Sequence, residues 1–232
     1  MIDILRVALR VEARSIGPYS GEVDPLDGDL HFAPAPRRVV VVPLRSFDSA
    51  KSRLRAAGTS NVASIAEQLA RAVLASCKPL PVVVVCETDD IERFAVANGA
   101  AVLRSPHTGL NAAVNFAYEH LAHDYHRIAI AHGDLRFPDG LGRFEPTATV
   151  TIVADRHGTG TNVLSLPTGL PFRFHYGPGS ARRHAREAQR LGLEVVTITD
   201  SPWRFDVDVP EDLTAIEANG GPTAPHSLGT AL

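Results

Sequence analysis

The chain has 232 residues, of which 44% are hydrophobic and 21% are charged, and this composition fits one large α/β domain with a sizeable core. The formal net charge of -3 at pH 7 excludes a strongly basic protein, so we expect no nucleic-acid partner. We find no apolar run long enough to span a bilayer and no secretory signal pattern, so we expect no membrane partner and a cytoplasmic location. Cys77 and Cys86 have no metal-binding spacing and fit a reducing compartment.

The two ends of the chain differ in character from its middle. In residues 1–37 a short apolar stretch is followed by many glycines and prolines, which interrupt any regular element. We therefore predict a poorly ordered or irregular N-terminal extension over 1–37 and a single domain over 38–218. The segment 219–232 is rich in glycine, proline and serine, and we expect a flexible tail there.

Between these ends, strand patterns alternate with helix patterns. Four consecutive valines at 39–42 predict a strand buried on both faces, as in a parallel sheet. Further strands are predicted at 82–85, 101–103, 127–131, 149–153, 162–164 and 194–199, with an edge strand at 171–175. Helices are predicted at 61–77, 89–98, 109–123, 180–191 and 210–218. This alternation predicts an α/β fold with a mostly parallel, Rossmann-like sheet flanked by helices.

The loop that follows the first valine strand carries three cations. Pro43 ends the strand because it cannot donate to a sheet ladder, and Arg45, Lys51 and Arg53 precede the next helix. Open α/β sheets bind ligands beyond the carboxyl ends of their strands. The loop therefore suits a polyanion such as a nucleoside triphosphate, and a basic surface loop is the alternative interpretation.

Three carboxylates suit a hard cation. Asp134 comes directly after the predicted strand at 127–131, and Asp206 and Asp208 form an Asp-Val-Asp pair. In an extended segment the two side chains of that pair share one face. Because Mg²⁺ prefers oxygen ligands, usually carboxylates together with substrate phosphates, we predict a Mg²⁺ site here. A helix cap and a surface charge are the alternative for the Asp-Val-Asp pair.

Two glycine-rich runs favour anion binding. Gly158-Thr159-Gly160-Thr161 offers open backbone N–H groups and hydroxyl donors, which predicts an anion-binding nest. Gly177-Pro178-Gly179-Ser180 opens a predicted helix, whose N-terminus is a second anion site, with Arg182 and Arg183 beside it. Each run taken alone also fits a simple turn.

Taken together, these segments resemble one known family. The stretches that carry the resemblance are Pro43-Leu44-Arg45 with 50–54, then 109–113, Asp134-Leu135, 158–164, 174–180 with His184, and 206–213. They are similar to the guanylyltransferases of coenzyme F-420 biosynthesis, which include 2-phospho-L-lactate guanylyltransferase and phosphoenolpyruvate guanylyltransferase. The resemblance covers most of the chain and implies a GT-A-like nucleotidyltransferase fold of the molybdopterin guanylyltransferase type.

The resemblance also implies roles for individual residues. The Mg²⁺ ligands would be Asp134, Asp206 and Asp208, which with Lys51 would form the catalytic group. The residues at the GTP would be Arg45, Lys51, Arg53, Leu110 and Asn111. The residues that hold the small phosphorylated carboxylic acid acceptor would be Thr161, Gly177 and Ser180. The sequence leaves a homodimer open.

Three positions depart from the family pattern. The family usually has lysine at the position of Arg45, proline at the position of Arg136 and threonine at the position of Val209. These departures leave the acceptor open between 2-phospho-L-lactate, phosphoenolpyruvate and 3-phosphoglycerate more than they affect the class of reaction. The alternatives are a sugar-phosphate nucleotidyltransferase and a non-catalytic nucleotide-binding protein. Retention of the three carboxylates argues against the second.

Overall fold

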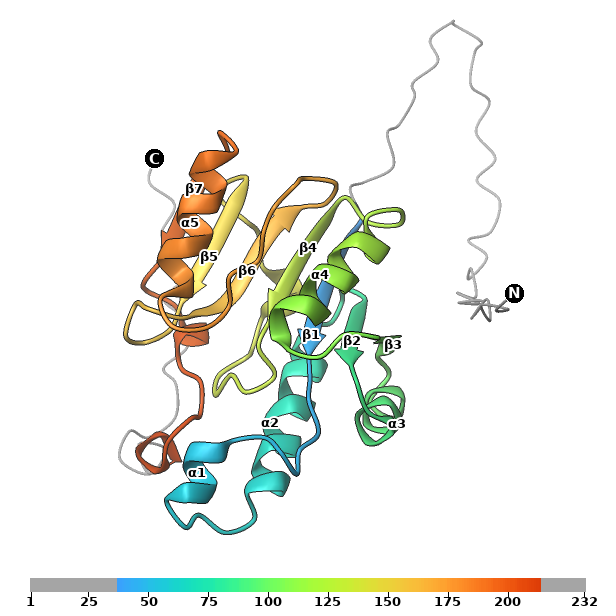
Figure 1. Ribbon diagram of the computed structural model, residues 1–232, viewed down its shortest axis with the longest axis vertical. Coiled ribbons are helices and arrows are strands. Elements are labelled where there is room, and N and C mark those ends of the chain that lie inside the picture. The colour runs from blue at the N-terminus through green and yellow to red at the C-terminus, as the bar shows by residue number, and fades with distance from the viewer. Residues whose placement is uncertain (1–36, 214–232) are drawn as a thin grey trace, which may run out of the picture. The chain divides into compact units, whose positions relative to one another are not determined.

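The computed structural model describes residues 37–213, which are drawn in colour in Figure 1. The predicted N-terminal extension, apart from Arg37, and the predicted tail over 219–232 lie outside these residues. Helical backbone begins at Pro210, and the rest of the helix predicted for 210–218 lies outside from residue 214. Within 37–213, none of the helices combines the length and the apolar character needed to cross a bilayer.

Seven strands and five complete α-helices lie within the described part of the chain, besides the helical residues that begin at Pro210. The strands are β1 (Arg38–Pro43), β2 (Val82–Cys86), β3 (Ala101–Arg104), β4 (Arg127–Ala131), β5 (Val150–Ala154), β6 (Thr161–Pro167) and β7 (Val195–Ile198). The α-helices are α1 (Ser52–Ala56), α2 (Val62–Ser76), α3 (Asp89–Ala97), α4 (Leu110–Leu121) and α5 (Ser180–Arg190). Two short 3₁₀ helices are η1 (Leu141–Arg143) and η2 (Pro202–Arg204).

The strands form one mixed sheet in the order β3-β2-β1-β4-β6-β5-β7. The pairs β3–β2, β2–β1, β1–β4 and β5–β7 are parallel, whereas β6 is antiparallel to both β4 and β5. The predicted α/β fold with a mostly parallel sheet is therefore confirmed. The strand order reverses between β1 and β4, and open α/β sheets bind ligands at such a switch point.

Helices cover both faces of the sheet and create two cores. Alternate valines of β1 point to opposite faces: Val39 and Val41 pack with α4 and α5, whereas Val40 and Val42 pack with α2 and α3. All four side chains are fully buried. Strands buried on both faces need continuous apolar runs, which is why the valine pattern is so clear in the sequence. Figure 1 shows α4 and α5 in front of the sheet.

The prediction of an edge strand at 171–175 is wrong. The alternation is real, because Phe172, Phe174 and Tyr176 are buried against the core that contains α4 and α5. However, the segment has no strand partner, because side chains satisfy its backbone N–H groups. The three bonds run from Arg173 N–H to Glu187 Oε1, from His175 N–H to His184 Nε2, and from Tyr176 N–H to Asn111 Oδ1, at 3.1, 2.8 and 2.7 Å. Helices α4 and α5 therefore hold this segment in place of a strand.

Candidate active site

A cavity of about 750 Å³ opens at the carboxyl edge of the parallel strands. It lies beyond the ends of β2, β1 and β4, and it also reaches the amino end of β6, because β6 runs in the opposite direction. The predicted site residues that line it are Arg45, Lys51, Arg53, Leu110, Asp134, Thr161, Gly177, Ser180, Asp206 and Asp208. One cavity therefore gathers predicted site residues that lie far apart in the sequence.

Backbone pairing brings the two acidic segments together. Leu135 and Asp206 form an antiparallel bridge. Two hydrogen bonds flank this bridge, from Arg136 N–H to the Phe205 carbonyl (2.7 Å) and from Val207 N–H to the Asp134 carbonyl (3.1 Å). The Asp-Val-Asp segment is thus extended and held directly beside the end of β4.

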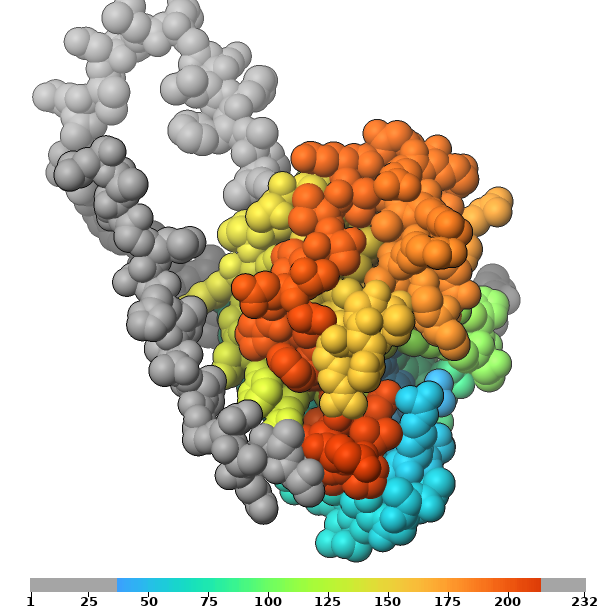
Figure 2. Space-filling model, turned by 90° about the vertical axis from the view of Figure 1, so that its left-hand side faces the viewer, coloured from blue at the N-terminus to red at the C-terminus, as the bar shows by residue number. Residues whose placement is uncertain are grey.

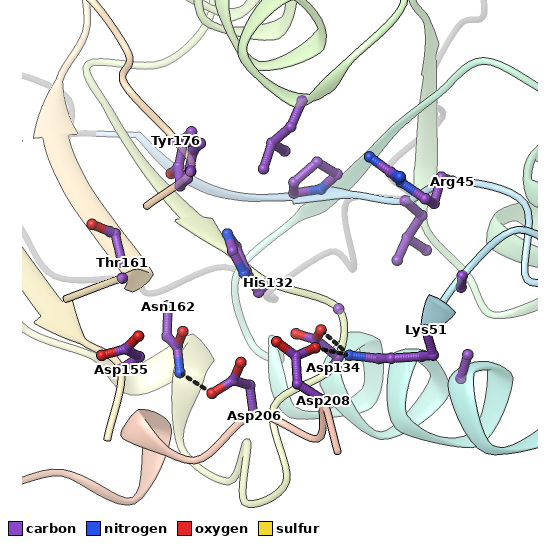
Figure 3. A pocket seen from close by; sticks show the side chains of 18 of the residues that line it. Arg45, Lys51, His132, Asp134, Asp155, Thr161, Asn162, Tyr176, Asp206 and Asp208 are labelled. Carbon is purple, nitrogen blue, oxygen red and sulfur yellow. Dashed lines mark hydrogen bonds and ion pairs between the residues drawn. The ribbon is translucent and has the colours of Figure 1, made fainter. Parts of the chain in front are cut away.

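The carboxylates of Asp134, Asp206 and Asp208 form one cluster (Figure 3), with one oxygen from each within 4.8 Å of the others. Burial, together with the charges of the other two carboxylates, raises the pKa of Asp206. Asp134 Oδ1 is buried and has no hydrogen-bond partner among the described residues. Mutually repelling carboxylates and an unpaired buried oxygen fit a divalent cation, and the all-oxygen set suits Mg²⁺. The side-chain amide of Asn162 donates to Asp206 Oδ1 at 3.4 Å and helps to orient it.

Lys51 is a cation that contacts two of these three carboxylates. Its side chain is only 7% exposed, and its ammonium group bonds Asp134 Oδ2 and, at 3.1 Å, Asp208 Oδ1. Burial alone would lower the pKa of Lys51, but these two carboxylates raise it above its ordinary value, so the side chain is charged. The backbone of Lys51 is left-handed, with φ 57°, a strained conformation often found at functional sites.

Packing below the cavity fixes the position of Lys51 relative to Asp208. Leu54 of α1 is fully buried in a cluster with Val62 and Val207, and Leu213 packs on its edge. Figure 2 shows the same arrangement from outside, with the red segment that ends at residue 213 lying against the cyan region of α1. The loop that carries Lys51 and the segment that carries Asp208 therefore share one small apolar core.

Two further predicted cations lie at the cavity in exposed positions. Arg53 is 74% exposed, and its Nη1 lies 3.6 Å from Asp208 Oδ2. Arg45 is also exposed, on the side of the cavity away from Thr161 (Figure 3). Exposed ion pairs contribute little to stability, so the pair with Asp208 does not prevent Arg53 from binding an anion in the cavity. Arg45 is exposed and is likewise available to an anion.

Thr161 is held by a buried histidine that the sequence analysis gave no role. His184 Nε2 accepts the N–H of His175 at 2.8 Å, so the proton of the neutral ring lies on Nδ1. Burial, with smaller contributions from His175 and Arg183, lowers the pKa of His184 to about 3 and keeps the ring neutral. Nδ1–H then donates to Thr161 Oγ1 across 3.1 Å. The hydroxyl proton of Thr161 is therefore free to be donated into the cavity that this residue lines.

The start of α5 lies beside Thr161. The N–H of Ala181 donates to the Thr159 carbonyl at 3.1 Å and joins the two glycine-rich runs. Ser180 is 2% exposed and lines the cavity. Gly177 has φ 116°, a conformation that a side chain would strain, so this turn requires glycine.

The anion-binding nest predicted for 158–161 is in large part filled by the protein itself. Asp155 Oδ1 accepts the N–H of Thr159 at 2.8 Å, and Asp155 Oδ2 lies 3.2 Å from the Thr159 hydroxyl. Burial raises the pKa of Asp155, but hydrogen bonds from Thr159 and the Gly160 backbone lower it by more. The run thus does form an anion site, but an internal carboxylate occupies it, and Thr161 is left as the donor that faces the cavity.

Asn111 does not line the cavity, although it was predicted to lie at the nucleotide. Its side-chain oxygen accepts the N–H of Tyr176 at 2.7 Å, and its side-chain N–H group donates to the Tyr176 carbonyl at 3.1 Å. Both polar atoms of Asn111 are therefore used to hold the backbone just before Gly177. Leu110, the first residue of α4, does line the cavity.

Asp212 supports the site without having been predicted to do so. Its Oδ2 accepts the backbone N–H groups of Asp208 and Val209 at 2.7 and 2.9 Å, and its Oδ1 bonds Arg156. Arg156 lines the cavity and belongs to the β5–β6 turn, so this ion pair connects that turn to the Asp-Val-Asp segment. Asp212 belongs to the stretch that carries the family resemblance, but its sequence position alone indicates only a charge in the first turn of a helix.

Side chains of different character occupy different parts of the cavity. Figure 3 shows Arg45 and Lys51 on one side, Thr161 and Tyr176 on the other, and the acidic cluster between them. The mixed sheet of this order has a fold of the GT-A-like nucleotidyltransferase type. A nucleotidyl transferase from Methanothermobacter thermautotroptrophicus has the same fold, with a TM-score of 0.57 over 78% of this chain and 96% of that chain. At 16% identity this likeness shows the fold alone.

Sequence comparison identifies the family. Residues 38–227 match the family described as "Guanylyl transferase CofC like", and the chain belongs to this family of guanylyltransferases. A 3-phospho-D-glycerate guanylyltransferase from Phenylobacterium zucineum is 36% identical over 148 residues, which are 60% of this chain and 66% of that protein. A phosphoenolpyruvate guanylyltransferase from Rubrobacter xylanophilus is 32% identical over 202 residues, which are 78% of this chain and 94% of that protein.

Proposed function

We propose that this protein transfers GMP from GTP to the phosphate of a small phosphorylated three-carbon acid and releases diphosphate, as a step in coenzyme F-420 biosynthesis. The observation that carries the proposal is the order of groups across one cavity, with cations, acidic cluster and hydroxyl donors in sequence. A phosphate oxygen of the acceptor forms the new P–O bond to the α-phosphorus of GTP. The bond from that phosphorus to the bridging α–β oxygen breaks, and its electrons leave with diphosphate.

The acceptor needs no dedicated general base, because its phosphate is already ionised near neutral pH. The residues therefore act by positioning and by neutralising charge, as in other phosphoryl transfers. Lys51, Arg45 and Arg53 bind the triphosphate oxygens. Asp134, Asp206 and Asp208 would hold Mg²⁺, which would neutralise negative charge on the phosphates when bound.

Thr161, Ser180 and the backbone at Gly177 bind the phosphate and carboxylate of the acceptor. This assignment is supported by the hydrogen bond between His184 and the Thr161 hydroxyl, and by the place of Thr161 on the side of the cavity opposite Arg45 and Lys51 (Figure 3). A small acid with many acceptor oxygens needs donors from two sides, and the two glycine-rich runs, joined through Ala181, supply them.

An activity assay that compares the three candidate acids as acceptors tests the proposal and identifies the acid. The purified protein is incubated with GTP, Mg²⁺ and, in turn, phosphoenolpyruvate, 3-phospho-D-glycerate or 2-phospho-L-lactate, and diphosphate release is measured. We expect diphosphate with at least one of these acids and none with GTP alone. Absence of turnover with all three acids would contradict the proposal.

Carboxylate variants test the proposed metal site. Asp134→Asn and Asp208→Asn should each lower the turnover rate at least about 100-fold, since loss of one electrostatic stabiliser commonly costs that much. The fold should survive, because both side chains lie at a solvent-accessible cavity. Asp124→Asn is the matched control, since Asp124 is exposed and does not line the cavity. Full activity in both cavity variants would refute the metal assignment.

A further inference from the structure

Glu87 is a carboxylate to which the proposed reaction gives no role. It directly follows β2, is half-buried and lines the cavity. Within residues 37–213 it forms no ion pair with a lysine, an arginine or a histidine. An uncompensated negative charge would repel the phosphates of any ligand. Glu87 therefore has to face an uncharged part of the ligand, one that donates hydrogen bonds.

The order of the strands places Glu87 at the end of the cavity away from the acceptor residues. Along the ligand edge, Glu87 follows β2, Arg45 lies just beyond β1, Asp134 follows β4, and Thr161 begins β6. Neighbouring strands lie about 4.8 Å apart, so the ends of β2 and β4 are separated by roughly 10 Å. A nucleoside triphosphate with its phosphates at Lys51 and Asp134 can span that separation with its base beside Glu87.

The walls around Glu87 suit a flat, uncharged ring. The cavity there is lined by Pro43 at the end of β1 and by the next residue, Leu44, by Val85 of β2, and by Leu110 and Ala113 of α4. Ligand pockets combine apolar walls of this kind with a small number of polar groups that fix orientation. Glu87 supplies a carboxylate beside these apolar walls.

We propose that Glu87 selects guanine by accepting hydrogen bonds from the N1–H and the 2-amino group of the base. This inference rests on the proposed function, which places the nucleotide in this half of the cavity. An ionised carboxylate accepts hydrogen bonds and donates none. Glu87 Oε1 accepts one bond and keeps a second lone pair, and Oε2 makes no hydrogen bond within the described residues, so both oxygens can accept from a ligand. Adenine presents N1, a hydrogen-bond acceptor, at the position of the guanine N1–H. The carboxylate of Glu87 would then have no donor there, and an unpaired polar group of this kind makes a site reject the wrong substrate.

Glu87 also has a structural contact that a test must preserve. Its Oε1 accepts the N–H of Gly109, the residue that precedes α4, at 3.0 Å. Glu87→Gln keeps an oxygen for this bond and replaces the other oxygen by an amide N–H₂ group. Xanthine carries a carbonyl oxygen where guanine carries the 2-amino group. The amide N–H₂ group of the introduced glutamine can donate to that oxygen, whereas in guanine it faces another donor.

The test measures binding of GTP, ITP and XTP by calorimetry with Mg²⁺ present, together with diphosphate release for each nucleotide. Loss of a hydrogen bond to a charged group corresponds to about 10- to 100-fold in affinity. The wild-type protein should therefore bind GTP at least about 10-fold more tightly than ITP, which lacks the 2-amino group. In Glu87→Gln, GTP binding should weaken by about 10- to 100-fold and XTP binding should improve relative to GTP.

Glu119→Gln is the matched control, because Glu119 is an exposed residue of α4 outside the cavity, and it should keep the wild-type order of nucleotides. Equal binding of GTP and ITP by the wild-type protein, or an unchanged order in Glu87→Gln, would overturn the assignment of Glu87. Guanine preference in binding without transfer to any acceptor would instead overturn the proposed function and leave the assignment of Glu87 in place.

Discussion

Replacement of His184 by glutamine should reduce the loss of stability that the protein suffers in mild acid. His184 is fully buried, and its burial lowers its pKa to about 3 from the ordinary value of 6.5. In the unfolded chain this imidazole binds a proton below pH 6.5, whereas in the folded protein it stays neutral until about pH 3. The free energy of unfolding therefore falls as the pH drops through this window, because the unfolded state binds the extra proton.

The expected effect is large enough to measure. One proton taken up on unfolding changes the free energy of unfolding by about 1.4 kcal/mol per pH unit. Between pH 6.5 and pH 5, His184 alone therefore removes about 2 kcal/mol of stability. Glutamine does not titrate, and its side-chain oxygen can accept the N–H of His175 in place of Nε2. We therefore expect the variant to fold, with its stability reduced at pH 7.

Urea denaturation of the wild-type protein and of His184→Gln at pH 7, 6 and 5 measures this effect. The stability difference between the two proteins at pH 7 should shrink by about 2 kcal/mol at pH 5, while contributions from all other groups cancel. His123→Gln serves as the control, because His123 is exposed. If the wild-type protein and His184→Gln lose stability in parallel, then His184 is not a neutral buried histidine, and the inferred direction of the Thr161 hydroxyl fails with it.

Three further substitutions test separate parts of the structure. Asn111→Ala leaves the N–H and the carbonyl of Tyr176 without their side-chain partner, so it should lower stability by about 1–3 kcal/mol and raise the acceptor KM. The control Asn115→Ala, on the exposed face of α4, should change neither quantity. Equal effects of the two substitutions in urea denaturation and in kinetic assays would contradict this prediction. Gly142→Ala should lower stability by about 1–3 kcal/mol or more, since a Cβ there would collide with the Cys77 carbonyl, and an unchanged melting temperature would refute that packing. Lys51→Ala should weaken GTP binding more than acceptor binding, and unchanged GTP affinity by calorimetry would remove Lys51 from the nucleotide site.

The fold was predictable because its strongest signals are local. The valine runs of β1 and β2 are buried on both faces, as in a sheet covered by helices, and no polar residue interrupts either run. Asp134 and the cationic loop at Lys51 were predictable for a related reason. Both come directly after a recognisable strand, and the carboxyl ends of parallel strands meet at one edge.

The errors have a common cause in hydrogen bonds between side chains and the backbone that no local sequence pattern indicates. Nothing near Tyr176 in the sequence indicates that Asn111 satisfies both of its backbone groups, so the alternation by itself predicts a strand. Likewise, a run such as Gly-Thr-Gly-Thr indicates available N–H groups, but not that Asp155 accepts from Thr159. A sequence pattern reports which groups need partners, and only the fold determines which partners they receive.

Because β6 runs opposite to β4, the residue proposed to bind the acceptor and the residues proposed to bind GTP follow different kinds of connection. The acceptor residue Thr161 begins a strand and follows the hairpin turn that links β5 to β6, whereas Lys51 and Asp134 follow the ends of β1 and β4. Hairpin turns tolerate insertion and replacement well, since the paired strands on either side keep their register. On the proposed assignment, part of the acceptor specificity can therefore change by exchange of one short surface turn, while the strand ends that lead to Lys51 and Asp134 stay in place.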